Sequence, residues 1–125
     1  MARVFLLVAA IFAGLAVAAG AFASHALRER LSDRSLEIFQ TAAQYQMYHA
    51  LALFLVAVLL SRLESESFIL VAAGYAFTAG VVIFSGSLYA LSLSGTKVLG
   101  AITPLGGLFF ITGWVCVAIY ATKFK

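Results

Sequence analysis

VFLLVAAIFAGLAVAAGAFASHAL, residues Val4–Leu27, contains no Asp, Glu, Lys or Arg. Three further stretches share this property: Phe39–Ser61, Phe68–Leu91 and Val98–Thr122. All charged residues of the chain, eight basic and five acidic, lie outside the four stretches. Each stretch has about 24 residues, enough for a helix rising about 1.5 Å per residue to cross a hydrocarbon core of roughly 30 Å. The pattern predicts four transmembrane helices.

The composition sets the fold class. Of the 125 residues, 64% are hydrophobic and only 10% are charged, which leaves too little polar surface for a soluble domain of this size. The second and third gaps between the stretches are short, so consecutive helices are expected to be antiparallel neighbours. We therefore expect one all-α domain over residues 1–125, a four-transmembrane-helix bundle with up-down-up-down topology. The first stretch is longer than the apolar core of a usual signal peptide, and we expect it to remain as an uncleaved span.

The basic residues lie at the ends of the predicted spans. They give the chain a net charge of +3, and at those positions they meet lipid headgroups rather than nucleic acid. Four basic residues fall on each side of the membrane, so the positive-inside rule is tied, and the free amino terminus favours cytoplasmic termini. The longest gap, Arg28–Ile38, fits either a short amphipathic helix at the headgroup level or a solvated charged loop.

Small residues form one face of the first span: Ala10, Gly14, Ala18 and Ala21. Their spacing of three or four places them on one side of a helix. Because lipid provides little hydrophobic drive between helices, such faces favour close packing of helix against helix. A four-span bundle also has a small interior. A homo-oligomer, or docking to a larger membrane complex, is therefore an expected arrangement.

Polar residues are unevenly distributed with depth. We name as the B side the side of the membrane reached by the first and third gaps, and as the A side the side with both termini. Ser, Thr, Gln and His are concentrated in the B-side half. Unpaired polar groups are costly in hydrocarbon, so they should face one another inside the bundle or line water. This reasoning selects a candidate polar cluster: His25, Gln40, Thr41, Gln44, Tyr45, His49, Ser85, Ser87, Tyr89, Thr103 and Pro104.

Two interpretations of this cluster follow. It is either a polar vestibule or small ligand site open to the B side, or a set of hydrogen bonds that hold the helices together. On the second span the inward face is expected to carry Thr41, Gln44, Tyr45, Tyr48 and His49. In the fourth span, Pro104 cannot donate to the carbonyl of Gly100, and we expect Thr103 or a facing Gln to replace that bond.

His49 is the histidine near the centre of the membrane, and His25 lies near the B-side end of the first span. An intramembrane imidazole is either a proton relay or a neutral, hydrogen-bonded core residue. The two histidines differ in depth by about ten residues, roughly 15 Å, which argues against bis-histidine haem ligation. Cys116 lies toward the A side, so no soft-metal site forms with it, and as the single cysteine it excludes an internal disulfide. Since no carboxylate pair, phosphate loop or Ser-His-Asp set is present, we predict no enzyme, no cofactor and no metal.

Four ordered motifs carry a family resemblance: Gly20–Leu27 (GAFASHAL), Phe39–Leu51 (FQTAAQYQMYHAL), Phe84–Tyr89 (FSGSLY) and Leu99–Gly107 (LGAITPLGG). The chain resembles the YgdD/YwdK family of small bacterial inner-membrane proteins over nearly its whole length. Ala23-Ser24 departs from the Gly-Ala expected before the histidine. The resemblance implies a four-helix, multi-pass protein of the bacterial inner membrane whose function is unassigned, and it carries over no catalytic residue.

Three functions are compatible with the sequence. The first is a structural or interaction role, as an oligomer or an accessory subunit, because small-residue faces are present and no acid lies within a span. The second is a small-solute or proton-coupled transporter or channel that uses the polar cluster around His49. The third is a lipid or quinone site in the B-side half.

Overall fold

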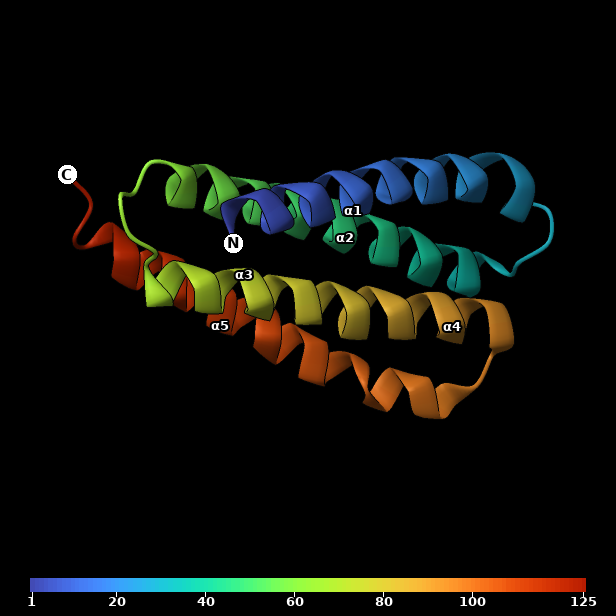
Figure 1. Cartoon of the computed structure of the whole chain (residues 1–125). Coiled ribbons are helices and arrows are strands. Elements are labelled where there is room, and N and C mark those ends of the chain that lie inside the picture. Colours follow the sequence, from blue (N-terminus) through green and yellow to red (C-terminus); the bar gives the residue numbers. More distant parts are fainter.

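The computed structural model describes residues 1–125, and all of its regular structure is helical. The elements are α1 (Ala2–Phe22), η1 (Ala23–Leu27), α2 (Asp33–Ser61), α3 (Phe68–Gly80), η2 (Val81–Ser85), α4 (Gly86–Ser94), η3 (Lys97–Ala101) and α5 (Thr103–Ala121). They join into four spans: Ala2–Leu27, Asp33–Ser61, Phe68–Ser94 and Lys97–Ala121. Each span is long and apolar enough to cross a membrane. The predicted all-α fold with four antiparallel spans is confirmed (Figure 1).

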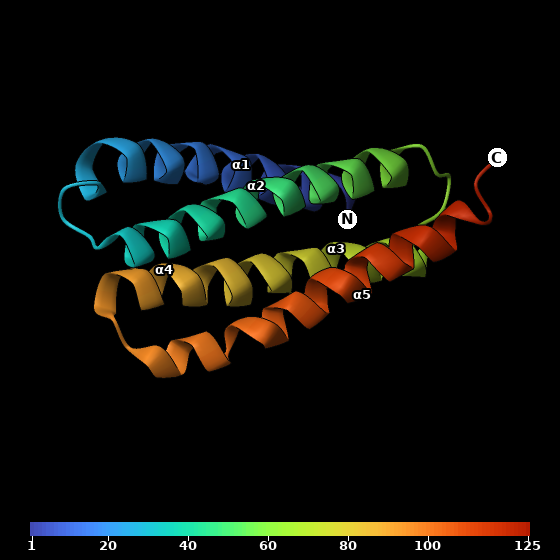
Figure 2. The same ribbon diagram turned by 180° about the vertical axis from the view of Figure 1, so that it is seen from behind.

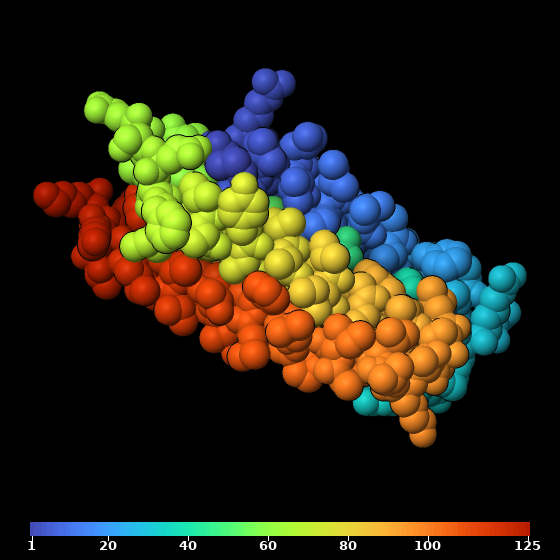
Figure 3. Space-filling model, turned by 60° about the horizontal axis from the view of Figure 1, so that its bottom comes forward, coloured from blue at the N-terminus to red at the C-terminus, as the bar shows by residue number.

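The bundle consists of two antiparallel hairpins that pack on each other. One hairpin is formed by α1 and α2, and the other by α3–α4 and α5 (Figures 1 and 2). Helix α2 packs against α1, α3 and α4, whereas α5 packs mainly against α3 and η2. On one face of the molecule the span α3–α4 separates α1 from α5 (Figure 3). Helix α2 therefore makes most of the contacts between the two hairpins.

Local capping explains where the spans begin and end. The Ser32 hydroxyl accepts a hydrogen bond from the Ser35 N–H at 3.1 Å, and Asp33 lies in the first turn of α2, where a negative charge is favourable. The Arg28–Ile38 gap is therefore a short turn followed by helix that continues into the second span. It is neither a separate amphipathic helix nor a solvated loop throughout. At the B-side end of the third span, Gly95 has a φ of 71° and ends α4 in the left-handed conformation that glycine adopts readily.

The interior is divided by depth. A core of twelve buried apolar residues occupies the A-side half and the centre: Phe5, Ala9, Ala52, Leu53, Val56, Ala57, Leu60, Leu70, Ala73, Phe77, Val81 and Phe110. The buried polar residues Gln46, His49, Ser85, Ser87 and Ser92 lie from mid-depth to the B side. Polar side chains thus gather in the half of the membrane that the sequence indicated.

Glycines set the distance between α5 and the third span. A Cβ at Gly106 would overlap the backbone of Phe84, one at Gly113 would overlap the Phe77 ring, and one at Gly80 would overlap the Phe110 ring. These glycines allow aromatic rings and backbone to approach directly, as is usual between membrane helices. The third span also contains a π-helical turn, Val81–Ser85, at this contact, and such turns occur frequently at functional sites.

The fourth span differs from the expectation of one continuous helix. A 3₁₀ segment, Lys97–Ala101, comes first, and α5 begins at Thr103 with Pro104 in its first turn. Proline is well tolerated there because a first-turn N–H has no partner within the helix. Thr103 directs its hydroxyl to the carbonyl of Leu99 at 3.4 Å, and not to that of Gly100 as predicted.

Candidate functional site

Gln46 connects three of the four spans. Its side-chain Nε2 donates to the backbone carbonyl of Phe12 in α1 at 2.8 Å. Its Oε1 accepts from the phenol of Tyr89 in α4, also at 2.8 Å. Gln46 is 5% exposed, so both bonds lie within the bundle. One amide thereby bonds α2 to both α1 and α4.

Two serines extend this network toward the B side. The Ser85 hydroxyl donates to the carbonyl of Ala42 in α2 at 2.8 Å. The hydroxyl oxygens of Ser87 and Thr103 lie 2.6 Å apart. Each hydroxyl also lies near a carbonyl of its own span, Ser87 near that of Phe84 at 3.0 Å and Thr103 near that of Leu99 at 3.4 Å, so either hydroxyl can be the donor in the pair. The third span is in this way bonded to the second and the fourth.

His49 is held by both of its ring nitrogens. The indole N–H of Trp114 in α5 donates to Nε2 at 3.1 Å. Because an indole can only donate, Nε2 is the acceptor, and Nδ1 carries the proton that bonds the carbonyl of Tyr45 at 2.8 Å. The ring stacks on Phe110 with a centroid distance of 3.5 Å and an interplanar angle of 7°. This geometry selects a neutral imidazole that is part of the core.

The network is complete within one chain. No buried side-chain nitrogen or oxygen lacks a hydrogen-bond partner. Interhelical hydrogen bonds in membranes contribute on average about 0.6 kcal/mol each. The interior arrangement is what helix packing needs, and its polar atoms already bond one another and backbone carbonyls.

Several predicted cluster residues lie outside this network. His25, Gln40 and Gln44 are exposed. Thr41 bonds the carbonyl of Glu37 on its own helix at 3.0 Å, and Tyr45 is 38% exposed beside the Phe84 ring. The structure brings together His49, Ser85, Ser87, Tyr89 and Thr103, with Pro104 next to them in α5. The expectation that Gln44 and Tyr48 face inward is wrong, since both are exposed. The helix turns Gln46 inward instead.

Gln46 and Trp114 are the network residues absent from the predicted cluster. For Gln46 a signal existed, since Phe39, Ala42, Gln46, Ala50 and Leu53 recur at spacings of three or four and are all buried. Trp114 offered no comparable signal, because it lies in an apolar span and is 44% exposed. Only the packing of α5 reveals that the indole N–H of Trp114 reaches His49.

A groove lies on the outer surface between α1 and α2. Its volume is about 430 Å³, and it is lined by Ala16, Gly20, Ser24, Gln40, Ala43, Gln44 and Met47. The side-chain hydrogen bonds of α2 are made by Thr41, Gln46, His49 and Ser61. The amides of Gln40 and Gln44 make none, so the groove presents two free amides at the level of the B-side half.

The sequence matches the family described as "Protein of unknown function (DUF423)" over residues 19–107. The chain belongs to the DUF423 family. It is similar to the UPF0382 membrane protein YwdK of Bacillus subtilis, with 46% identity over 122 residues that cover 98% of both chains. The UPF0382 membrane protein SAB0533 of Staphylococcus aureus is 43% identical over the same length and coverage. These relatives confirm the expected family and a membrane protein, while no solved structure matches the chain.

The DUF423 match includes most of the network. Gln46, His49, Ser85, Tyr89 and Thr103 lie within residues 19–107. Phe12 and Trp114, which supply a carbonyl to Gln46 and an N–H to His49, lie outside it. The network of this DUF423 protein therefore depends on the first and last spans as well as on the matched region.

The Ser87–Thr103 pair gives a measurable coupling. We expect Ser87→Ala and Thr103→Val each to lower the free energy of unfolding, and the double variant to lose less than the sum. The coupling should be about 0.6 kcal/mol, as for other interhelical bonds in membranes. Unfolding in mixed detergent micelles measures the free energies of the wild type, the two single variants and the double variant. Ser94→Ala is the control, since its hydroxyl bonds the Ala90 carbonyl of its own helix, and additive effects of Ser87 and Thr103 would contradict the assigned bond.

Proposed function

We propose that the chain is a multi-pass protein of the bacterial inner membrane that acts by binding other transmembrane helices, as an oligomer or an accessory subunit, and not as an enzyme. The observation that carries this proposal is the outer groove of α1 and α2, with its two free glutamine amides. In a bilayer these amides need hydrogen-bond partners, which lipid tails do not supply.

Gln44 lies within the hydrocarbon region. It comes five residues after Phe39, where the charge-free stretch of the second span begins, which is about 7.5 Å along a helix. An amide with no partner in an apolar medium costs several kcal/mol in the worst case. A polar side chain or carbonyl of another transmembrane helix, seated in the groove, would remove that cost.

The glycines of α1 also favour the approach of another helix: Gly20 lines the groove, and Gly14 lies outside it on the exposed surface of α1. A Cβ at Gly14 or at Gly20 would meet nothing within 4 Å, so packing within the chain does not require glycine at either position. Glycine inside a helix costs up to about 1 kcal/mol relative to alanine. By contrast, Gly74, Gly80 and Gly113 each face an aromatic ring of the same chain. A second helix that approaches α1 closely would give Gly14 and Gly20 the same role.

Transport and quinone or lipid binding in the B-side half are less well supported by the geometry. A proton carrier needs a water-reachable His49, yet this side chain is 6% exposed and both ring nitrogens are bonded. A quinone or lipid tail would use the shallow groove of about 260 Å³ beside Phe12, Gln46, Ser85 and Tyr89. The polar atoms of Gln46, Ser85 and Tyr89 there are engaged with one another or with backbone.

Gln44→Leu tests the proposal. We expect the wild-type chain to be recovered from membranes in a complex of fixed stoichiometry, and Gln44→Leu to lose that complex while it stays folded. Mass measurement in lipid nanodiscs, after gentle extraction, reads the stoichiometry. Thr112→Val is the matched control because Thr112 is exposed on α5 and bonds its own helix at Leu108. A wild-type chain that is a single free species in nanodiscs and in native membranes would contradict the proposal.

A further inference from the structure

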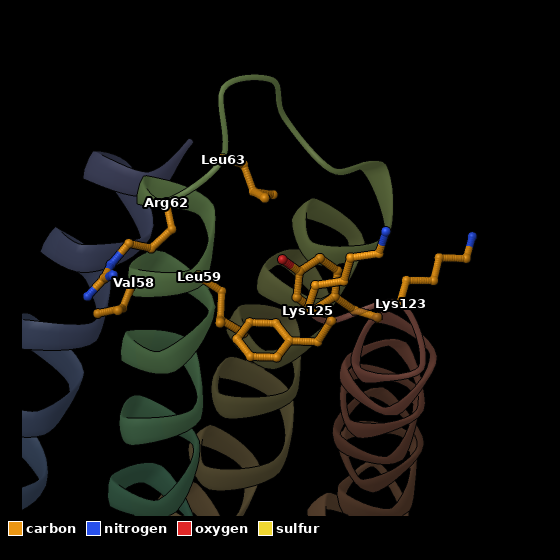
Figure 4. A pocket seen from close by; sticks show the side chains of 8 residues that line it. Val58, Leu59, Arg62, Leu63, Lys123 and Lys125 are labelled. Carbon is orange, nitrogen blue, oxygen red and sulfur yellow. The ribbon is translucent and has the colours of Figure 1, made fainter.

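A hollow of about 560 Å³ lies at the A-side end of the bundle, opposite the polar network. It is lined by Val58, Leu59, Arg62, Leu63, Tyr120, Lys123, Phe124 and Lys125. Figure 4 shows Arg62 at the end of α2 with its side chain directed toward α1, the two lysines beyond the end of α5, and Leu59 and Leu63 between the two groups. The hollow therefore has an apolar floor and a rim that carries three basic residues.

None of the three cations has an ion-pair partner. The ion pairs of the chain join the Met1 amino group to Glu66 at 2.6 Å and Arg34 to Glu37 at 3.4 Å. Glu64, the other acidic side chain at the A-side end, is exposed and is in neither of these ion pairs. Arg62, Lys123 and Lys125 are thus free to bind an anion, and Arg and Lys are the usual ligands of phosphate.

An apolar groove continues from the hollow toward the hydrocarbon region. It has a volume of about 270 Å³ and is lined only by hydrophobic residues: Leu59, Val117, Tyr120, Ala121 and Phe124. Leu59, Tyr120 and Phe124 line both spaces. A ligand that fills them has an anionic head at the membrane surface and an apolar tail along α2 and α5.

We propose that this A-side hollow binds an anionic phospholipid, with the headgroup at the basic rim formed by Arg62, Lys123 and Lys125 and an acyl chain along the Leu59–Tyr120 groove. The position fits a lipid, because the hollow lies where the second and fourth spans end and basic residues meet headgroups. Basic pockets between membrane helices bind anionic headgroups in this way. A free phosphate would satisfy the cations, but it would leave the adjoining groove empty.

The test compares lipids that share acyl chains and differ in headgroup. Purified chain is delipidated in mild detergent, titrated with phosphatidylglycerol or phosphatidylcholine, and measured by native mass spectrometry. We expect bound phosphatidylglycerol to survive and phosphatidylcholine to be lost. The double variant Arg62→Gln, Lys123→Gln should bind phosphatidylglycerol about thirtyfold more weakly, since each basic residue near an anionic membrane contributes roughly a factor of five. Both side chains are exposed, so the variant is expected to fold.

The matched control is the double variant Arg30→Gln, Lys97→Gln, which removes two exposed cations at the B-side end. It should bind phosphatidylglycerol as the wild type does. Equal losses in the two double variants would overturn the proposal, because they would indicate attraction by overall charge. Equal retention of phosphatidylcholine would also overturn it. Inorganic phosphate at millimolar concentration should not displace the lipid, and full displacement would assign the hollow to a soluble anion instead.

Discussion

Gly106→Ala is expected to lower the free energy of unfolding by about 3 kcal/mol, at the upper end of the cost of overpacking. A Cβ at this position would lie 2.7 Å from the Cα of Phe84 and closer still to its backbone nitrogen. Since backbone cannot rotate away as a side chain does, α5 has to move off the third span. Thermal or detergent-induced unfolding, followed by the fluorescence of the single tryptophan, measures the loss.

Gly107→Ala is the control for this prediction. The next glycine along α5 has nothing within 4 Å of an added Cβ, so alanine should be neutral or stabilise the helix by up to about 1 kcal/mol. Equal stability of the two variants would show that α5 is not seated against Phe84 as described.

His49→Ala is expected to lower the free energy of unfolding by about 2–4 kcal/mol, the range for truncation of a large core side chain. The change removes the ring stacked on Phe110 and the acceptor of the Trp114 N–H. It also removes the donor to the Tyr45 carbonyl. Unfolding in micelles measures stability, and the emission of Trp114 should shift because its N–H loses its partner.

Two further variants separate the contributions of His49. His49→Phe keeps a ring against Phe110 and should recover most of the stability, since the interhelical bond it loses, to Trp114, is worth about 0.6 kcal/mol. His25→Ala should have almost no effect because His25 is exposed and makes no side-chain bond across the bundle. A His49→Ala protein as stable as the wild type would contradict the core role and would favour the proton-relay hypothesis.

The positions of the charged residues and the depth of the polar ones were sufficient to predict the four-span architecture. Carrying a charge into hydrocarbon is expensive, so the ends of the charge-free stretches mark the spans whatever the details of packing. The same cost requires polar side chains to find partners, and this is why depth alone located the region where His49, Ser85 and Tyr89 bond other spans. Helix capping at Ser32 and the turn at Gly95 are equally local.

The facing of individual residues was harder to predict. Gln44 and Gln46 are both glutamines of the second span, so residue type does not distinguish them. They are two positions apart, which is more than half a helical turn. Which one turns inward depends on the rotation of α2, and that rotation is set by the contacts of Phe39, Ala42 and Leu53 with other spans. The predicted inward face was therefore wrong at Gln44 and Tyr48, while the half of the membrane was right.

The sequence by itself determined the four spans, their antiparallel order and the polar half of the membrane, because transfer of charge and amide groups into lipid is a property of each residue. The tertiary structure alone decided that Trp114 bonds His49, that Gly106 seats α5 on the Phe84 backbone, and that the cations of Arg62, Lys123 and Lys125 flank one hollow. These pairings join distant segments of the chain. They depend on helix rotation and close approach, which packing of the whole bundle fixes and no local pattern encodes.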